Sequence, residues 1–243
     1  MRQWCCSLVF LVLPLAMHAF ESTKDHRERE LINHVTKSID LAIQNTSNFD
    51  ENGLSLKGRA SLKICHLLNN LCTLAENVYF QLGVRNGAQC LAALFGNEGS
   101  VAQAVALDDW SDLDSEMAEF ISGALSFIPT VPLRHYKIDF LSLEQKPLSE
   151  RPISIYYYSP KQEAFSHEKA FTSFDESFDD VFIVVIDNWN WSSVRSGTFS
   201  AFHELGYKVL FRKVFTTDEF NLNTWGNGLM IAVVKKRGIY RGL

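Results

Sequence analysis

The sequence has few cysteines, and none of them is spaced like the ligands of a structural zinc site. Five cysteines occur in 243 residues. Cys5 and Cys6 lie in an apolar N-terminal segment, and Cys65, Cys72 and Cys90 form an odd set without a C-x-x-C spacing. This pattern excludes a disulfide framework and a zinc ribbon, and it favours buried thiols.

Several other functional signatures are missing as well. The chain contains no phosphate-binding P-loop, no nucleophile elbow and no repeat. An excess of basic charge is also missing, since the formal net charge is −5. We therefore find no electrostatic reason for a nucleic-acid partner and expect none. No set of residues suggests a metal site, and the sequence does not indicate an oligomeric state.

The first twenty residues differ from the rest of the chain. Arg2 precedes an almost uninterrupted apolar run over residues 7–19, and a polar stretch begins at Glu21. This is the layout of a secretory signal peptide, although cleavage after Ala19 would leave the large Met17 where a small residue is preferred. We expect residues 1–20 to be a signal peptide or an uncleaved signal anchor, and the protein to be exported or membrane-anchored. If the segment does not act in targeting, the protein is cytoplasmic.

The remaining chain divides into an N-terminal helical extension, residues 21–50, and one domain, residues 51–243. Apolar residues recur at helical spacing from Leu31 to Ile43, and a second helix is expected over residues 62–74. After this helix, β-branched and aromatic runs alternate with helical stretches. The predicted strands cover residues 77–84, 102–107, 135–140, 153–158, 180–186, 207–215 and 229–235, and the predicted helices between them cover residues 88–95, 113–125, 166–173 and 194–205.

This alternation predicts an α/β fold, a Rossmann-like three-layer sandwich whose mostly parallel sheet has helices on both faces. The last two strands are joined by a loop, residues 216–228, that contains no predicted helix. Strands joined without a crossover are most simply antiparallel neighbours. The sequence therefore predicts a parallel sheet with an antiparallel last strand.

Ligands of open α/β sheets bind at the carboxyl ends of the strands, so polar residues there are the candidate site. The loop after the first strand carries Gln81, Gly83, Arg85 and Gly87. Its glycines permit a sharp turn, and the amides that begin the next helix can receive an anionic group. The alternative is a tight strand-to-helix turn that binds no ligand.

Acidic residues end the next two strands. Asp108 can accept hydrogen bonds from both ribose hydroxyls of an adenosine ligand, with Asp109 as its rival; one of the two can instead cap the next helix. Asp139 can meet an adenine amine or cap a turn. A glycine loop followed by a second-strand acid is typical of a nucleoside-binding fold.

These motifs, in this order, resemble those of bacterial class I S-adenosylmethionine-dependent methyltransferases. The closest subgroup has first strands similar to Y-L-E-I-G-x-x-x-G-S and second strands similar to G-I-D-N-W-S. The segments that carry the resemblance are VYFQLGVRNGA, LAALFGN, VALDDWSDLD, VIDNWNWSSVRSGT and WGNGLMIAVVKK, within residues 50–236. The resemblance implies a seven-stranded sheet with its last strand inserted antiparallel, and S-adenosyl-L-methionine as cofactor. It places Gly83 and Gly87 beside the methionine part and Asp108 on the ribose.

Three positions depart from the family pattern. The first-strand acid is Gln81, which cannot pair as a carboxylate with the ammonium group of the cofactor. The fourth-strand Y-D-G-x-H run is YSPKQ here, so Ser159 and Gln162 replace an aspartate and a histidine. Hard divalent cations are anchored by carboxylates. The substitutions therefore remove a metal ligand of those relatives that use Mg²⁺.

One carboxylate remains at the end of the fifth strand. Asp187 and Asn188 are the catalytic candidates because they can orient a substrate hydroxyl, although Asp187 can instead cap the next helix. Trp189 and Trp191 are candidates for a pocket wall. The sequence favours O-methylation of a small molecule or a glycan. One alternative is a methyltransferase-fold protein that has lost catalysis and acts as a binding or interaction module, and another is a different nucleoside-binding enzyme.

Overall fold

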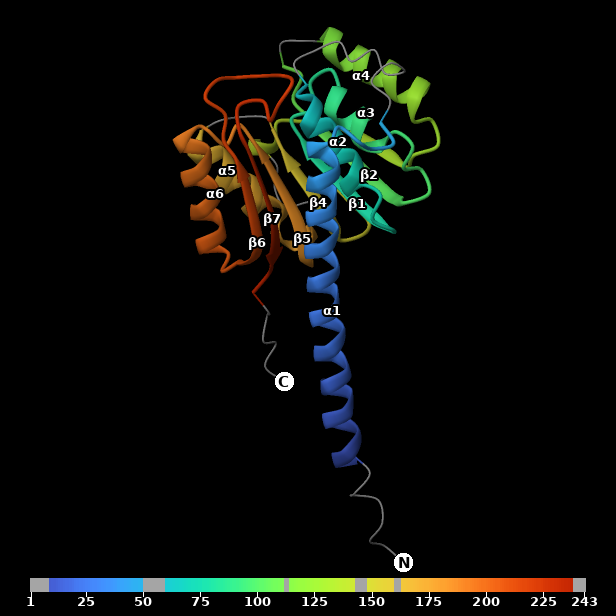
Figure 1. Ribbon diagram of the computed structural model, residues 1–243, viewed down its shortest axis with the longest axis vertical. Coiled ribbons are helices and arrows are strands. Elements are labelled where there is room, and N and C mark those ends of the chain that lie inside the picture. The colour runs from blue at the N-terminus through green and yellow to red at the C-terminus, as the bar shows by residue number, and fades with distance from the viewer. Residues whose placement is uncertain (1–8, 50–59, 112–113, 143–147, 160–162, 238–243) are drawn as a thin grey trace, which may run out of the picture.

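The computed structural model describes residues 9–49, 60–111, 114–142, 148–159 and 163–237. Its strands are β1 (Asn77–Leu82), β2 (Val101–Asp108), β3 (Leu133–Lys137), β4 (Ile153–Tyr158), β5 (Phe178–Asp187), β6 (Lys208–Phe215) and β7 (Leu229–Lys235). They form one seven-stranded sheet in the order β3-β2-β1-β4-β5-β7-β6 (Figure 1). β1 to β5 pair in parallel, and β7 lies antiparallel between β5 and β6. The predicted sheet is confirmed.

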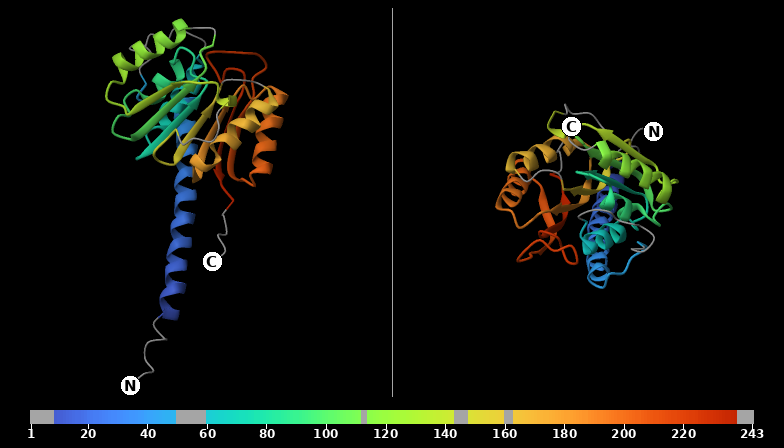
Figure 2. Two further views of the ribbon diagram at one scale, coloured as in Figure 1. Left: turned by 180° about the vertical axis from the view of Figure 1, so that it is seen from behind. Right: turned by 90° about the horizontal axis from the view of Figure 1, so that it is seen from above.

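Helices cover both faces of this sheet (Figure 2). They are α1 (Val9–Ile43), α2 (Leu62–Leu71), α3 (Ala88–Leu94), α4 (Asp114–Phe127), α5 (Ala164–Phe174) and α6 (Ser192–Glu204), with short 3-10 turns η1 (Phe140–Ser142) and η2 (Asp175–Ser177). One hydrophobic core packs the four helices α1, α2, α3 and α4 against one face of the sheet. A second core packs α5 and α6 against the other face. The predicted three-layer α/β sandwich is therefore confirmed.

The central strands are apolar because both of their faces are covered. Every residue of β1 and β4 is buried, which matches the continuous apolar runs expected of a covered parallel sheet. The edge strands β3 and β6 instead expose charged side chains, among them Arg134, Lys137 and Arg212. Charges on an edge oppose pairing with a second sheet.

The second half of α1 belongs to the domain core. Leu31, Val35, Ile39 and Ala42 recur at helical spacing and are at most 5% exposed. The helix begins at Val9, earlier than the apolar stripe alone predicted, and its first half projects beyond the body (Figures 1 and 2). The predicted domain boundary after residue 50 and the first eight residues of the apolar segment lie outside the described residues. Within the described part of the chain, no helix is both long enough and apolar enough to cross a membrane.

Candidate functional site

The carboxyl ends of four parallel strands lie in a row at one edge of the sheet. In spatial order these strands are β2, β1, β4 and β5, and the residues at or just after their ends are Asp108, the loop 83–87, Ser159 and Asp187. The fold therefore brings the predicted cofactor residues and the predicted catalytic residues to the same edge. We call this row the carboxyl edge.

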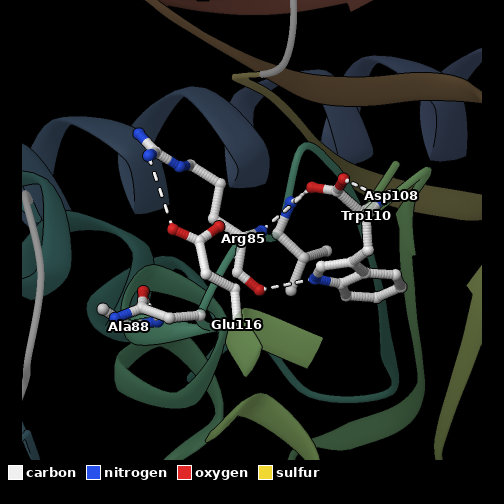
Figure 3. Close-up of polar contacts among 7 residues, drawn as sticks. Arg85, Ala88, Asp108, Trp110 and Glu116 are labelled. Carbon is white, nitrogen blue, oxygen red and sulfur yellow. Dashed lines mark hydrogen bonds and ion pairs between the residues drawn. The ribbon is translucent and has the colours of Figure 1, made fainter. Parts of the chain in front are cut away.

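Asp108 fastens the loop after β1 to the end of β2 (Figure 3). Its Oδ2 accepts hydrogen bonds from the backbone N–H groups of Val84, at 2.6 Å, and Arg85, at 2.9 Å, and its Oδ1 accepts one from Trp110, at 3.0 Å. A carboxylate offers about four lone-pair positions. One position on Oδ1 therefore remains for a single ribose hydroxyl, rather than the pair expected from the sequence.

Strained backbone is concentrated at this edge. Arg85, Trp110 and Asn188 have φ angles of 53°, 41° and 59°, in the left-handed region that residues other than glycine rarely occupy. They follow β1, β2 and β5. The indole N–H of Trp110 donates to the Arg85 carbonyl at 2.7 Å, and the Arg85 guanidinium lies 3.5 Å from Glu116 (Figure 3). Such strain persists where surrounding contacts impose it, and it is common at functional sites.

The two loop glycines have different roles. Gly83, with φ of 80°, turns the chain out of β1, and its N–H donates to the Leu107 carbonyl. Gly87, with φ of 85°, is the N-cap of α3. A Cβ atom added to Gly87 would lie 2.3 Å from the ring of Phe120. Close packing of α4 against the loop therefore explains why a glycine stands at position 87. The resemblance implied a place for this residue beside the methionine part of a cofactor.

Gln81 is turned inward and is engaged by neighbouring residues. Its side chain is fully buried. Its Oε1 accepts a hydrogen bond from the Tyr79 hydroxyl at 2.7 Å, and its Nε2 donates to the Gly83 carbonyl at 2.9 Å. The amide thus stabilises the start of the loop, and it brings no negative charge to the end of β1.

Asp139 follows β3, beside the end of β2. Its Oδ1 accepts a hydrogen bond from the Leu141 N–H, and its carbonyl accepts the Ser142 hydroxyl. The N–H of the preceding residue, Ile138, donates to the Asp108 carbonyl. Asp139 therefore shapes the start of η1, as its turn-capping alternative predicted, and it remains half-buried near Asp108.

Asp187 lies in a cluster of hydroxyl groups at the other end of the row. Its Oδ2 accepts hydrogen bonds from Tyr157 Oη and Ser159 Oγ, both at 3.0 Å, and its Oδ1 accepts one from the Asn188 N–H at 2.7 Å. Burial raises the pKa of this carboxyl above its ordinary value, and the three hydrogen bonds oppose the rise. Ser159 thus donates to the carboxylate of Asp187.

The residues after Asp187 separate into buried and exposed positions. Trp189 is 3% exposed and packs edge-on against Phe199, whereas Trp191 is 49% exposed at the start of α6. Only Trp191 is available to line a surface site. The N-cap of α6 is Trp191, which makes no side-chain capping bond, so Asp187 does not cap this helix. Residues 160–162, the end of the fourth-strand motif, lie outside the described residues.

Neither Tyr79 nor Tyr157 was selected from the sequence. Both belong to strands that were predicted as buried cores, and both lie on the face that also carries Gln81 and Asp187. Side chains alternate between the two faces along each strand, so the sequence indicates which residues share this face. Only the pairing of Tyr157 with Val185 across β4 and β5 brings the tyrosine to Asp187. The described residues contain no group of three or more His, Cys, Asp or Glu that could hold a metal ion.

The sequence matches no model of a known protein family and no curated protein. The structure is similar to TrmN from Thermus thermophilus, with a TM-score of 0.54, 11% identity, and coverage of 75% of this chain and 51% of that one. It is also similar to a candidate RNA methyltransferase from Pyrococcus horikoshii (TM-score 0.52, 15% identity, 81% and 97% covered). An O-methyltransferase from Bacillus cereus in complex with SAH matches as well (TM-score 0.52, 12% identity, 82% and 91% covered).

The chain has the Rossmann-like fold of these methyltransferases. It spans about half the length of TrmN. At such identities the likeness concerns the fold alone. Because proteins with this fold include a candidate RNA methyltransferase, the fold does not support the expectation that nucleic acid is excluded as a partner.

Proposed function

We propose that this protein is a methyltransferase that uses S-adenosyl-L-methionine to methylate a hydroxyl group on a small molecule or a glycan. The observation that carries the proposal is the carboxyl edge, where Asp108 lies three strands away from the Asp187 hydroxyl cluster and the loop after β1 lies two strands away. A position for the nucleoside and a proton acceptor at the same edge suit the transfer of a methyl group from a bound cofactor to a bound acceptor molecule. The net charge of −5 favours a small acceptor over RNA.

The described residues fit the nucleoside half of the cofactor better than its amino-acid half. The remaining acceptor position of Asp108 Oδ1 suits a ribose hydroxyl, and Asp139 lies near it for the base. Gln81 and Ser159 are neutral, so neither supplies a carboxylate for the ammonium group. The cofactor is thus expected to be held mainly through its nucleoside, because the N–H groups of Gly83, Val84 and Arg85 already donate within the protein.

Asp187 is the proposed general base. When bound, the cofactor supplies an activated methyl group on its sulfonium, and positioning gives much of the acceleration. Asp187 removes the proton from the acceptor hydroxyl as that oxygen is methylated. Its raised pKa makes it a stronger base than an exposed carboxylate. Tyr157 and Ser159 fix the orientation of its Oδ2, and Asn188 fixes that of its Oδ1.

The N-terminal segment is proposed to act as a signal peptide or a signal anchor. Glu28 of α1 pairs with Lys235, at the end of β7, and this places the exit of α1 at the edge of the sheet opposite to the carboxyl edge (Figure 1). An anchored protein would therefore present its candidate site away from the membrane. Sequencing the N-terminus of the mature protein tests this, because an intact Met1 on soluble protein would contradict it.

A binding module without catalysis is the second candidate. The buried amide of Gln81 favours it, because this amide holds the loop together through two hydrogen bonds without contributing the negative charge that the resemblance leads us to expect at this position. The two candidates predict different results. A binding module would bind the nucleoside without transferring a methyl group.

Transfer of a labelled methyl group from S-adenosyl-L-methionine to a panel of hydroxylated small molecules and glycans tests the proposed function. We expect Asp187→Asn to lower the rate by about 10²–10⁴-fold, the usual contribution of a general base, while cofactor binding is kept. Asp108→Ala should weaken binding of the cofactor. Asp109→Asn, at the neighbouring acid, should change neither the transfer rate nor cofactor binding. Transfer that is unaffected by Asp187→Asn would contradict the role of Asp187.

A further inference from the structure

A cavity lies at the edge of the sheet opposite to the carboxyl edge. It has a volume of about 320 Å³ and is formed where β2 and β3 begin and where the chain approaches β4. This size falls within the range of roughly 300–1,000 Å³ that is usual for small-molecule sites. Its lining residues are Ala102, Gln103, Val131, Pro132, Leu133, Arg134, Glu150 and Arg151. None of these residues takes part in the proposed methyl transfer.

The side-chain amide of Gln103 is held in one orientation. Its Oε1 accepts hydrogen bonds from the Ser149 hydroxyl at 2.9 Å and from the Glu150 backbone N–H at 3.2 Å. A backbone N–H can only donate, so the atom that faces it must be the amide oxygen and not the nitrogen. The –NH₂ group therefore points away from this segment.

The –NH₂ group of Gln103 donates to no described residue, although the side chain lines the cavity and the residue is only 6% exposed. This nitrogen does not belong to the buried side-chain atoms of the described residues that lack a partner, so it reaches the surface of the cavity. A fixed donor at that surface is available to a ligand with an acceptor atom.

The rim adds two further donors. Arg134 contacts Glu150 at 2.6 Å, and Arg151 contacts Glu76 at 2.7 Å. A guanidinium carries five N–H donors, so each arginine keeps donors after its ion pair is made. The lining also contains an apolar stretch from Val131 to Leu133, whose Pro132 has no N–H.

From this arrangement we infer that the cavity binds a small organic monocarboxylate. Each arginine of the lining is already paired with a glutamate, Arg134 with Glu150 and Arg151 with Glu76, so these four charges sum to zero. Without excess positive charge, the donors of Gln103 and of the two guanidinium groups suit a monoanion better than a doubly charged phosphate, and Glu150 in the lining disfavours a second negative charge. The apolar stretch suits a hydrocarbon or aromatic body attached to the carboxylate.

Calorimetric titration of the full-length protein with benzoate tests the inference, with inorganic phosphate as the second ligand. The most informative variant is Gln103→Glu. It keeps the hydrogen bonds accepted from Ser149 and Glu150, and it replaces the –NH₂ group that faces the cavity with a carboxylate oxygen. We expect saturable benzoate binding, weakened at least about tenfold by Gln103→Glu because a charge-assisted hydrogen bond becomes a repulsion. The matched control is Gln89→Glu on α3, which makes the same charge change outside the cavity and should leave binding intact.

A second variant keeps the test decisive if Gln103→Glu does not fold. Arg151 has an exposed side chain, and Arg151→Gln should leave the thermal unfolding temperature unchanged while weakening benzoate binding a few-fold, about the effect of one rim charge. Three results would overturn the inference. These are no saturable binding at millimolar benzoate, tighter binding of phosphate than of benzoate, and benzoate binding that none of the cavity variants changes.

Discussion

At the scale of single residues, the carboxyl edge contains two aspartates that each accept three hydrogen bonds from different kinds of donor. Asp108 accepts all three from backbone N–H groups, whereas Asp187 accepts two from side-chain hydroxyls. Backbone donors are fixed in place, but hydroxyl groups can rotate. Asp108 is therefore suited to hold a loop and a ribose, and Asp187 is suited to exchange a proton.

The raised pKa of Asp187 leads to a pH-dependent stability. Burial keeps the carboxyl protonated in the folded protein above about pH 3.8, where an ordinary carboxyl has lost its proton. The folded state then binds more protons than the unfolded state, so this group's contribution to the free energy of unfolding falls as the pH rises from about 3.8 through the raised pKa. In Asp187→Asn this contribution disappears.

Urea unfolding of the wild type and of Asp187→Asn, at several values between about pH 4 and pH 7, measures the effect. We expect the free energy of unfolding of the wild type, relative to that of the variant, to decrease as the pH rises. A constant difference, or one that grows with pH, would show that burial does not raise this pKa.

At the scale of elements, the loop between β1 and α3 depends on a glycine that α4 packs against. In Gly87→Ala the new Cβ would lie 2.3 Å from Phe120, at a φ of 85° that alanine rarely adopts. We expect a loss of about 2–4 kcal/mol in the free energy of unfolding, from the left-handed backbone and the overpacked contact together. The measurement is chemical unfolding monitored by circular dichroism.

Gly99→Ala is the matched control for Gly87→Ala. A Cβ atom at Gly99 would have no atom within 4 Å, so the variant should unfold within about 0.5 kcal/mol of the wild type. If both alanine variants were equally stable, the packing of Phe120 on Gly87 would not be a structural requirement.

The elements could be predicted from the sequence more completely than the contacts between them. β4 and β7 have the predicted bounds because their apolar runs are continuous and end at polar residues or glycine. Asp108 and Asp187 were correctly expected at strand ends. The hydrogen bond of Gln81 with Tyr79 could not be predicted because it depends on the rotamers of two side chains on one strand face. That of Asp187 with Tyr157 depends on the register between β4 and β5, which one sequence does not encode locally.

At the scale of the whole molecule, α1 combines a projecting half and a core half. Removing residues 1–24 leaves the Glu28–Lys235 ion pair in place. It also leaves the buried apolar residues of α1, which are Leu31, Val35, Ile39 and Ala42. We therefore expect the shortened protein to keep the thermal unfolding temperature of the full chain. Removing residues 1–43 uncovers the core beneath Leu31, Val35 and Ile39, and each such side chain contributes about 1.5–3 kcal/mol.

Differential scanning calorimetry of the two shortened proteins tests this division. The loss of several buried side chains together is comparable to the total stability of a domain. The protein that lacks residues 1–43 should therefore show no cooperative transition. If it unfolded at the temperature of the full chain, α1 would be a separate extension and not part of the domain core.

Calorimetric titration of the purified protein with S-adenosyl-L-methionine measures whether the carboxyl edge binds this cofactor through Asp108. We expect saturable binding that Asp108→Ala weakens about 10- to 100-fold, the contribution of hydrogen bonds to a charged group, and that Asp109→Asn leaves unchanged. No binding at millimolar cofactor, or binding that is equal in wild type and Asp108→Ala, would contradict this expectation.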